Sequence, residues 1–251
     1  MTGLAVEQLF ADVAVGIPTV RSRAEALAAT VAEWRRFGVT PLVQLQPDDW
    51  PHTGESARRN GDALLARVLD ECRDARYILY CEDDVLLSPE LPYWIPACKH
   101  LNAPVTLVLD GERHYPSPLR SRLRSHNPLP ERIFLVHRLH EWWGSQCVWL
   151  PREIAEQVRD WPSRFYCWDV HLQQFLLQHG VPLYSVFPNL AQHRDVVSSL
   201  HPDRHVLHSR SFGLAGDGSA ISPPHDNNWC VYGAWHPDPR ALDVTNRVTR
   251  R

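Results

Sequence analysis

The stretch DARYILYCEDDVLLSPE, residues 74–90, decides how the fold of this chain is interpreted. Its first part, RYILYC at 76–81, is almost entirely apolar, which is typical of a strand buried on both faces of a parallel sheet. Three carboxylates, Glu82, Asp83 and Asp84, follow this run directly. Because like charges this close repel one another, this end of the strand needs a compensating positive charge.

Strand-like and helix-like segments alternate on both sides of the run. This alternation predicts an α/β fold, in which a largely parallel sheet is covered by helices on both faces. The expected strands of the first half lie at 12–18, 40–47, 76–81 and 104–110. The expected helices between them lie at 23–38 and 56–74.

Apolar residues at helical spacing indicate the buried face of each helix. In the first helix Leu27, Val31 and Trp34 form the apolar stripe, and Gly38 is placed to end the helix. In the second helix the stripe comprises Leu64, Leu65, Val68, Leu69 and Cys72.

The second half of the chain is less regular, which favours a mixed sheet within one domain over residues 1–212. Strands are expected at 132–139, 146–151 and 182–188, and helices near 152–160 and 169–179. Residues 213–251 are rich in Gly, Pro, Asp and Asn, and they predict a lid or an ordered tail on that domain.

Composition excludes several classes of protein. The chain has 251 residues and a formal net charge of −3, so the protein as a whole is not a polyanion binder. Its six cysteines form no C-x-x-C pair, which predicts reduced thiols without a zinc site or disulfides. The N-terminus lacks the pattern of a signal peptide, and no apolar run approaches the roughly 20 residues of a membrane span. We therefore expect a cytoplasmic protein.

Motif absences narrow the enzyme classes further. The chain contains no G-x-G-x-x-G, no G-x-x-x-x-G-K-[ST] and no G-x-S-x-G. This argues against dinucleotide oxidoreductases, P-loop enzymes and hydrolases with a nucleophile elbow.

The acidic triplet lies where an open α/β sheet binds ligands, at the carboxyl end of a strand. If the backbone stays extended, Glu82 and Asp84 point to one side and Asp83 to the other. Two carboxylates spaced in this way can share one divalent cation, which leaves coordination positions for phosphate oxygens. The alternative is an acidic turn in which Asp83 or Asp84 caps the following helix.

Two further groups of residues could meet a nucleotide. Thr19, Arg21 and Arg23 follow the first strand. Arg59 and Asn60 lie near the start of the second helix, whose free N–H groups attract anions. The alternative for each arginine is an ordinary solvated side chain.

Six stretches taken together resemble glycosyltransferases of the GT-A fold, most closely the group that includes N-acetylglucosaminyltransferase IV and the lipopolysaccharide-type transferases. The resemblance covers roughly residues 12–212 and implies a Rossmann-like nucleotide-binding half and a mixed central sheet. The stretches are IPTVRSR, ARRNGDAL, YILYCEDDV, WGSQCVWLPREI, YCWDVHLQQFL and PNLAQHRDVVSSL.

The resemblance also implies roles in a metal centre. Glu82-Asp83-Asp84 looks like a D-x-D-type motif, with Asp84 as a metal ligand and Glu82 or Asp83 nearer the ribose or the second coordination shell. His193 is similar to a late histidine that completes the metal site.

Further roles follow for the donor and the reaction. Thr19, Arg21, Arg59 and Asn60 match positions that hold the nucleotide and the pyrophosphate. Asp169 resembles the catalytic base of inverting members, although Trp168 stands where the family usually has Glu.

Aromatic and basic residues suggest where an acceptor would bind. Trp142 and Trp143, before Gly144, could form a stacking floor for a sugar, or they could be core aromatics. The segment 113–138 is rich in arginine, including Arg120, Arg122 and Arg124. It is either a solvated loop or a site for an anionic acceptor, such as a phosphorylated glycan or hydroxymethylated DNA.

The sequence therefore predicts a glycosyltransferase that uses Mn²⁺ or Mg²⁺ and a nucleotide sugar, with a UDP sugar favoured. Inversion is favoured because a base is available. Two alternatives stay open: a metal-dependent phosphoester hydrolase or nucleotidyltransferase, and a non-catalytic binding protein of the same fold.

Overall fold

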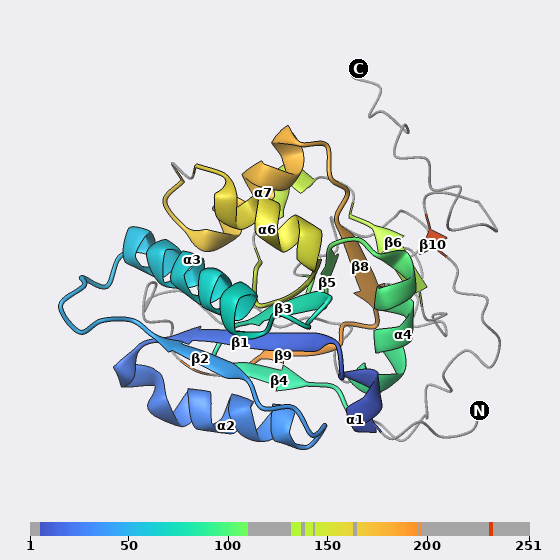
Figure 1. The fold of residues 1–251 in the computed structure, drawn as a ribbon, viewed down its shortest axis with the longest axis horizontal. Coiled ribbons are helices and arrows are strands. Elements are labelled where there is room, and N and C mark those ends of the chain that lie inside the picture. The colour runs from blue at the N-terminus through green and yellow to red at the C-terminus, as the bar shows by residue number, and fades with distance from the viewer. Residues whose placement is uncertain are drawn as a thin grey trace, which may run out of the picture.

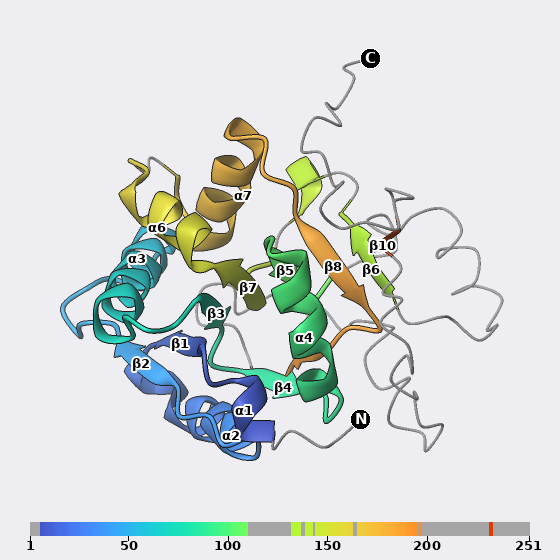
Figure 2. The ribbon, with the colours of Figure 1, turned by 45° about the vertical axis from the view of Figure 1, so that its right-hand side comes forward.

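A computed structural model describes residues 6–109, 132–136, 139–142, 144–162, 165–194, 196 and 231–232 (Figures 1 and 2). Several predictions lie outside these residues. They concern Trp143, the basic residues Arg120, Arg122 and Arg124, and the tail 213–251 apart from the two residues of one short strand.

The first half of the chain forms the regular alternation that the sequence predicts. After the short helix α1 (Val6–Leu9) come β1 (Val13–Thr19), the 3₁₀ turn η1 (Arg21–Arg23), α2 (Ala24–Arg35), β2 (Leu42–Leu45), α3 (Gly54–Glu71) and β3 (Tyr77–Cys81). Strand β1 pairs in parallel with both β2 and β3.

The second half contains more elements than expected. Several of its strands are only two or three residues long, which is too short for a pattern to be recognised in the sequence. They are β4 (Val85–Leu87), α4 (Leu91–Leu101), β5 (Val105–Thr106), β6 (Arg132–Leu135), η3 (Leu139–Glu141), β7 (Cys147–Pro151), α6 (Arg152–Asp160), α7 (Trp168–Gln178), β8 (Tyr184–Phe187), β9 (Ala191–His193) and β10 (Val231–Tyr232).

The main sheet has eight strands in the order β10-β6-β8-β5-β7-β3-β1-β2. Strand β7 is antiparallel to both of its neighbours, β3 and β5, and β6 is antiparallel to β8. The other pairs are parallel, so the sheet is mixed, as predicted. A separate two-stranded sheet, β4 with β9, was not expected from the sequence.

Helices cover both faces of the main sheet, which confirms the α/β class. In Figure 1, α3, α6 and α7 lie above the strands and α2 lies below them. Alternate residues of β3 enter the two apolar cores: Tyr77, Leu79 and Cys81 pack with α2 and α4, whereas Ile78 and Tyr80 pack with α3 and α7. Successive side chains of a strand point to opposite faces of the sheet, so β3 contributes to both cores.

Helix α2 differs from its prediction in the residues that it buries. Leu27 and Val31 are only partly buried, and the centre of the stripe is Ala26, Thr30 and Trp34. A polar side chain, Thr30, is thus fully buried in the middle of an apolar interface. Two residues after the C-cap of α2, Gly38 has φ +75°, which glycine adopts without steric cost.

The structure bears on two predictions made from composition, namely the reduced state of the cysteines and the lack of a membrane-spanning run. The described cysteines, Cys72, Cys81, Cys98, Cys147 and Cys167, are all free thiols. Among the helices that the structure describes, none combines the length and the apolar character needed to cross a membrane.

We predict a pH-dependent stability that arises from His171 of α7. Its imidazole is 1% exposed and stacks on Trp161 at 5.0 Å, and burial lowers its pKa from 6.5 to about 4. Because the unfolded chain takes up this proton first, the stabilisation present above pH 6.5 is lost as the pH falls towards 4. The loss is about 3 kcal/mol at most.

Urea unfolding between pH 6.5 and pH 4.5 measures this loss. A His171→Phe variant keeps an aromatic ring in the same place but does not titrate, so its free energy of unfolding should fall less steeply with pH. Equal pH dependence in both proteins would contradict the prediction.

Candidate metal centre

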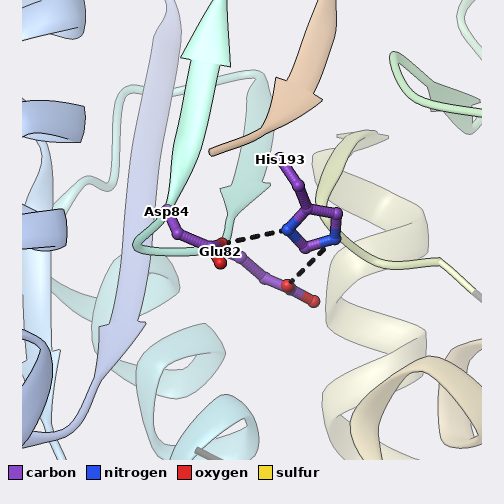
Figure 3. A group of neighbouring side chains, drawn as sticks. All are labelled: Glu82, Asp84 and His193. Carbon is purple, nitrogen blue, oxygen red and sulfur yellow. Dashed lines mark hydrogen bonds and ion pairs between the residues drawn. The ribbon is translucent and has the colours of Figure 1, made fainter. Parts of the chain in front are cut away.

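Three potential metal ligands converge from two places in the chain. Glu82 and Asp84 lie in the turn between β3 and β4, and His193 ends β9. Strand β4 pairs with β9 in antiparallel register, and Val85 lies opposite His193. This pairing carries residue 193 to the acidic turn, and Figure 3 shows both carboxylates extending towards the imidazole ring.

The spacing of these groups suits a single ion. His193 Nδ1 lies 3.2 Å from Asp84 Oδ1, and His193 Nε2 lies 3.9 Å from Glu82 Oε2. One ligand atom from each residue can be chosen such that all three lie within 4.8 Å of one another. Ligands bound at about 2.1 Å to an octahedral ion lie about 3–4 Å apart, so a small inward movement would close the site.

Asp83 is directed at Thr19 and Arg23 and not at His193, but residues 83 and 84 form a turn instead of the extended backbone that the prediction assumed. Its Oδ2 accepts a hydrogen bond of 2.5 Å from Thr19 Oγ1, and its Oδ1 accepts one of 2.7 Å from Arg23 Nε. Arg23 also reaches Asp84 Oδ2 at 2.5 Å. Arg23 therefore bridges Asp83 and Asp84, which leaves Asp84 Oδ1 directed at His193.

The pKa values follow from burial and from these neighbours. Burial is the main reason that the pKa of Glu82 rises from 4.5 to about 7. The charges of Asp84 and Asp169 act in the same direction, and that of His193 opposes them. Burial would also raise the pKa of Asp84, but His193 and Arg23 outweigh burial and lower it.

The charge balance and the donor set both fit a divalent cation. Among the described residues of this group, the three carboxylates carry three negative charges when ionised and Arg23 supplies one positive charge, so two negative charges remain when His193 is neutral. Carboxylate oxygens with one imidazole nitrogen are ligands for Mn²⁺, and carboxylates alone also suit Mg²⁺. The alternative of a simple helix cap does not hold, because the N-cap of α4 is Glu90 and β4 intervenes.

Asp169 is fixed beside this cluster by the residue before it. Trp168 is buried and stacks on Tyr80 of β3 with ring centroids 4.9 Å apart. On α3, a Cβ at Gly61 would lie 3.1 Å from the Trp168 ring, so the glycine makes room for it. The charges of Asp169 and Glu82 both raise the pKa of Tyr80, after burial itself, which shows that these groups lie within electrostatic reach of one another.

Asp169 is not the N-cap of α7. The N-cap is Cys167, and Asp169 lies in the first turn, where its Oδ1 accepts a hydrogen bond of 2.8 Å from the Val170 amide. The carboxylate is partly exposed, so it stays accessible to a proton donor outside the protein.

The segment before β7 forms another wall of the site. Ser145 Oγ donates to Glu82 Oε1 at 3.3 Å, and the Glu82 amide donates to the Gln146 carbonyl at 2.8 Å. The Trp142 carbonyl accepts a hydrogen bond from Gln173 of α7. This segment is thus attached both to the acidic turn and to the helix that carries Asp169.

The prediction that Trp142 offers a stacking surface is wrong. Trp142 is 2% exposed and packs in the core between the sheet and α7, so the alternative of a core aromatic holds for it. Gly144 is buried as well, and a Cβ there would lie 2.5 Å from Gln146 Oε1.

The residues predicted to hold a nucleotide occupy different environments. Thr19 binds the carboxylate of Asp83, and Arg23 binds the carboxylates of Asp83 and Asp84. Arg21 is largely exposed and pairs with Asp48 at 2.8 Å, as expected for a solvated arginine. The guanidinium of Arg59 lies 4.0 Å from the centroid of the Trp50 ring.

Asn60 has a structural role in addition to any contact with a ligand. It is buried, and its Nδ2 donates to the Thr19 carbonyl at 3.2 Å and to the Gln44 carbonyl at 3.4 Å. It thereby ties the ends of β1 and β2 together. Its Oδ1 is buried without a hydrogen-bond partner.

Two polar residues that contact the acidic turn were not predicted from the sequence. Ser145 contacts Glu82, and Thr30 contacts the backbone of the turn. The position of Thr30, a polar residue beside the apolar stripe of its helix, could have indicated a buried polar contact. Nothing in the local sequence indicates the contact of Ser145, because that contact depends on the pairing of β7 with β3.

Comparison with known proteins gives a distant structural likeness only. No known family model matches the chain, and no curated protein matches it. One similar solved structure is a Drosophila beta-1,4-galactosyltransferase 7 mutant in complex with manganese, UDP-Gal and xylobiose. It is 13% identical, the match covers 78% of this chain and 69% of that chain, and the TM-score is 0.40.

A second similar structure is a glycosyltransferase involved in the glycosylation of the major capsid of PBCV-1. It is 10% identical, the match covers 66% of this chain and 76% of that chain, and the TM-score is 0.34. Likeness at this level does not assign a function.

We predict that Mn²⁺ binding to the acidic cluster weakens below neutral pH. Glu82, with a pKa of about 7, must lose its proton before it can bind the ion. Affinity measured by calorimetry should fall by up to about tenfold between pH 7 and pH 6, with proton release on binding. Glu82→Gln should bind more weakly and show a smaller pH dependence; the remainder comes from His193, which must also be neutral to bind the ion. If the variant kept the full pH dependence, another group would be responsible.

Proposed function

We propose that this protein is a metal-dependent glycosyltransferase of the GT-A type, which transfers a sugar from a nucleotide diphosphate sugar to an acceptor hydroxyl. The observation that carries the proposal is the convergence of Glu82, Asp84 and His193 within electrostatic reach of Asp169. They meet at the carboxyl end of β3, the edge of an open α/β sheet where ligands bind.

Mn²⁺ is the proposed ion, held by Glu82, Asp84 and His193. An imidazole nitrogen is bound more readily by transition metals than by Mg²⁺, whereas carboxylates suit both. When bound, such an ion supplies positive charge to the diphosphate oxygens and stabilises the leaving group. We propose a UDP sugar as the donor, as the resemblance of the sequence motifs implies. The narrower likeness to the N-acetylglucosaminyltransferase IV group stays a prediction.

In the proposed reaction, different residues of the chain have different roles. The bond between the anomeric carbon and the diphosphate oxygen breaks, and its electron pair leaves with the nucleoside diphosphate. The acceptor oxygen forms the new bond to the anomeric carbon, and its proton passes to the carboxylate of Asp169. Arg23, paired with both Asp83 and Asp84, holds the acidic turn in place and offsets one of its negative charges. Direct attack assisted by one base inverts the anomeric configuration.

A thermal-shift experiment tests the metal and the donor together. UDP with Mn²⁺, each at about 100 times its dissociation constant, should raise the Tm by about 5–10 °C. UDP without metal should give a much smaller shift. Asp84→Asn should remove the joint effect, whereas Asp160→Asn, at an exposed ion pair on α6, should not. An undiminished shift in Asp84→Asn would refute the metal centre.

A second experiment tests the base. Asp169→Asn should lower kcat by about 10²–10⁴ and leave the Tm shift with UDP and Mn²⁺ in place. Glu153→Gln is a matched control, because Glu153 is also the acidic residue in the first turn of its helix. The assay is UDP release from a UDP sugar with an acceptor chosen from a panel of sugars and phosphorylated glycans. Turnover of the UDP sugar at phosphorus without any acceptor, which releases UMP instead of UDP, would favour the hydrolase alternative.

A further inference from the structure

A buried hydroxyl on α2 holds the backbone of the acidic turn from behind. Thr30 is 0% exposed, on the side of α2 that packs against β4. Its Oγ1 lies 2.9 Å from the Asp83 carbonyl and 3.1 Å from the Val85 carbonyl, to which it can donate. It accepts a hydrogen bond of 3.0 Å from the Val85 amide. A single side chain thus binds both residues that flank Asp84.

The pairing of β4 with β9 explains why this hydroxyl is needed. The Arg194 amide donates to the Asp84 carbonyl at 2.7 Å, so these two residues form a hydrogen-bonded pair. In antiparallel strands the next pair, Val85 with His193, is then a non-bonded one. The amide and carbonyl of Val85 point away from β9, and Val85 is 0% exposed. Without Thr30 these buried groups would lack a partner, which is destabilising.

The same helix also contacts the histidine strand. Arg194, the residue after His193, donates from Nη2 to the Ala29 carbonyl at 3.4 Å and to Glu33 Oε1 at 3.2 Å. One turn of α2 therefore binds the backbone beside Asp84 and the side chain beside His193. These contacts fix the two strands relative to each other through a third element.

We propose that Thr30 is a positioning residue of the metal centre: its hydroxyl sets the separation between Asp84 and His193, and thereby the affinity for Mn²⁺. The inference rests on the proposed function, because the ion is that of the proposed transferase. Thr30 lies behind the backbone of the turn, so it acts only through the ligands. A threonine within a helix commonly bonds to its own helix backbone, whereas this hydroxyl reaches residues 53 and 55 positions away.

Two substitutions at this position separate the hydroxyl from the shape of the side chain. Thr30→Val keeps the shape and removes the hydroxyl, and Thr30→Ser keeps the hydroxyl. We expect Thr30→Val to weaken Mn²⁺ binding about 10-fold, as is typical for groups that orient metal ligands, and Thr30→Ser to bind close to wild type. Mn²⁺ titration followed by electron paramagnetic resonance measures both. If Thr30→Val does not fold, Thr30→Ala, which leaves room for a water molecule, replaces it.

Thr106→Val is the matched control for the loss of a buried hydroxyl. Thr106 is also 0% exposed and donates to a backbone carbonyl, that of Val108. It lies on β5, two strands from β3 in the sheet order. The control should lower the Tm and leave the affinity for Mn²⁺ unchanged.

Hydrogen exchange of the metal-free protein gives a readout that does not depend on an ion. Thr30→Val should accelerate exchange at the amides of Val85 and Arg194, and Thr106→Val should not. If wild type binds no Mn²⁺, the proposed metal centre fails, and exchange alone decides whether Thr30 orders the turn.

Three results would overturn the inference about Thr30. The first is Mn²⁺ affinity in Thr30→Val equal to that of wild type. The second is an equal loss of affinity in Thr30→Ser or in Thr106→Val. The third is unchanged exchange at Val85.

Discussion

Repulsion among carboxylates at the end of β3 is the constraint on which the rest of the site depends. Glu82, Asp83 and Asp84 are consecutive; Asp83 and Asp84 are buried and the Glu82 side chain is 34% exposed, so the two buried carboxylates persist as anions only beside positive charge. Arg23 supplies that charge on one side of the turn and His193 faces it on the other. When all three carboxylates are ionised and His193 is neutral, Arg23 offsets one of the three negative charges within the described residues of the turn, and the other two match a divalent cation.

Ordinary backbone pairing assembles this site from segments that are far apart in the sequence. Strand β9 brings residue 193 to residue 84, and the start of β7 brings Ser145 and Gln146 to Glu82. Packing of Trp168 against Tyr80 and Gly61 places the next residue, Asp169. Each functional side chain is therefore adjacent to a residue whose position the core determines, which suits a site that must be rigid before a ligand arrives.

Elements with a pattern inside one segment were predictable from the sequence. Elements and contacts that depend on pairing between distant segments were not. The apolar run before Glu82 and the helical stripe around Leu64 indicated β3 and α3, because both signals lie within one segment. The different partners of Asp83 and Asp84 arise at a turn, not in the extended backbone that the prediction assumed. Strands of three residues, such as β4 and β9, carry too little periodicity to be seen. The buried state of Trp142 and the contacts of Thr30 depend on such strands or on the packing of distant helices.

The reversed direction of β7 has a consequence for the two segments that flank it. In a parallel strand, the loop that leaves the strand meets the ligand edge, and the loop that enters it lies at the opposite edge. Because β7 is antiparallel to β3, its entering segment meets the acidic turn while α6 follows at the far edge. A change in the segment that enters β7 would thus act on the acidic turn without displacing the helix that follows β7. The two ends of β7 therefore keep the segment that borders the acidic turn apart from the helix that covers the sheet.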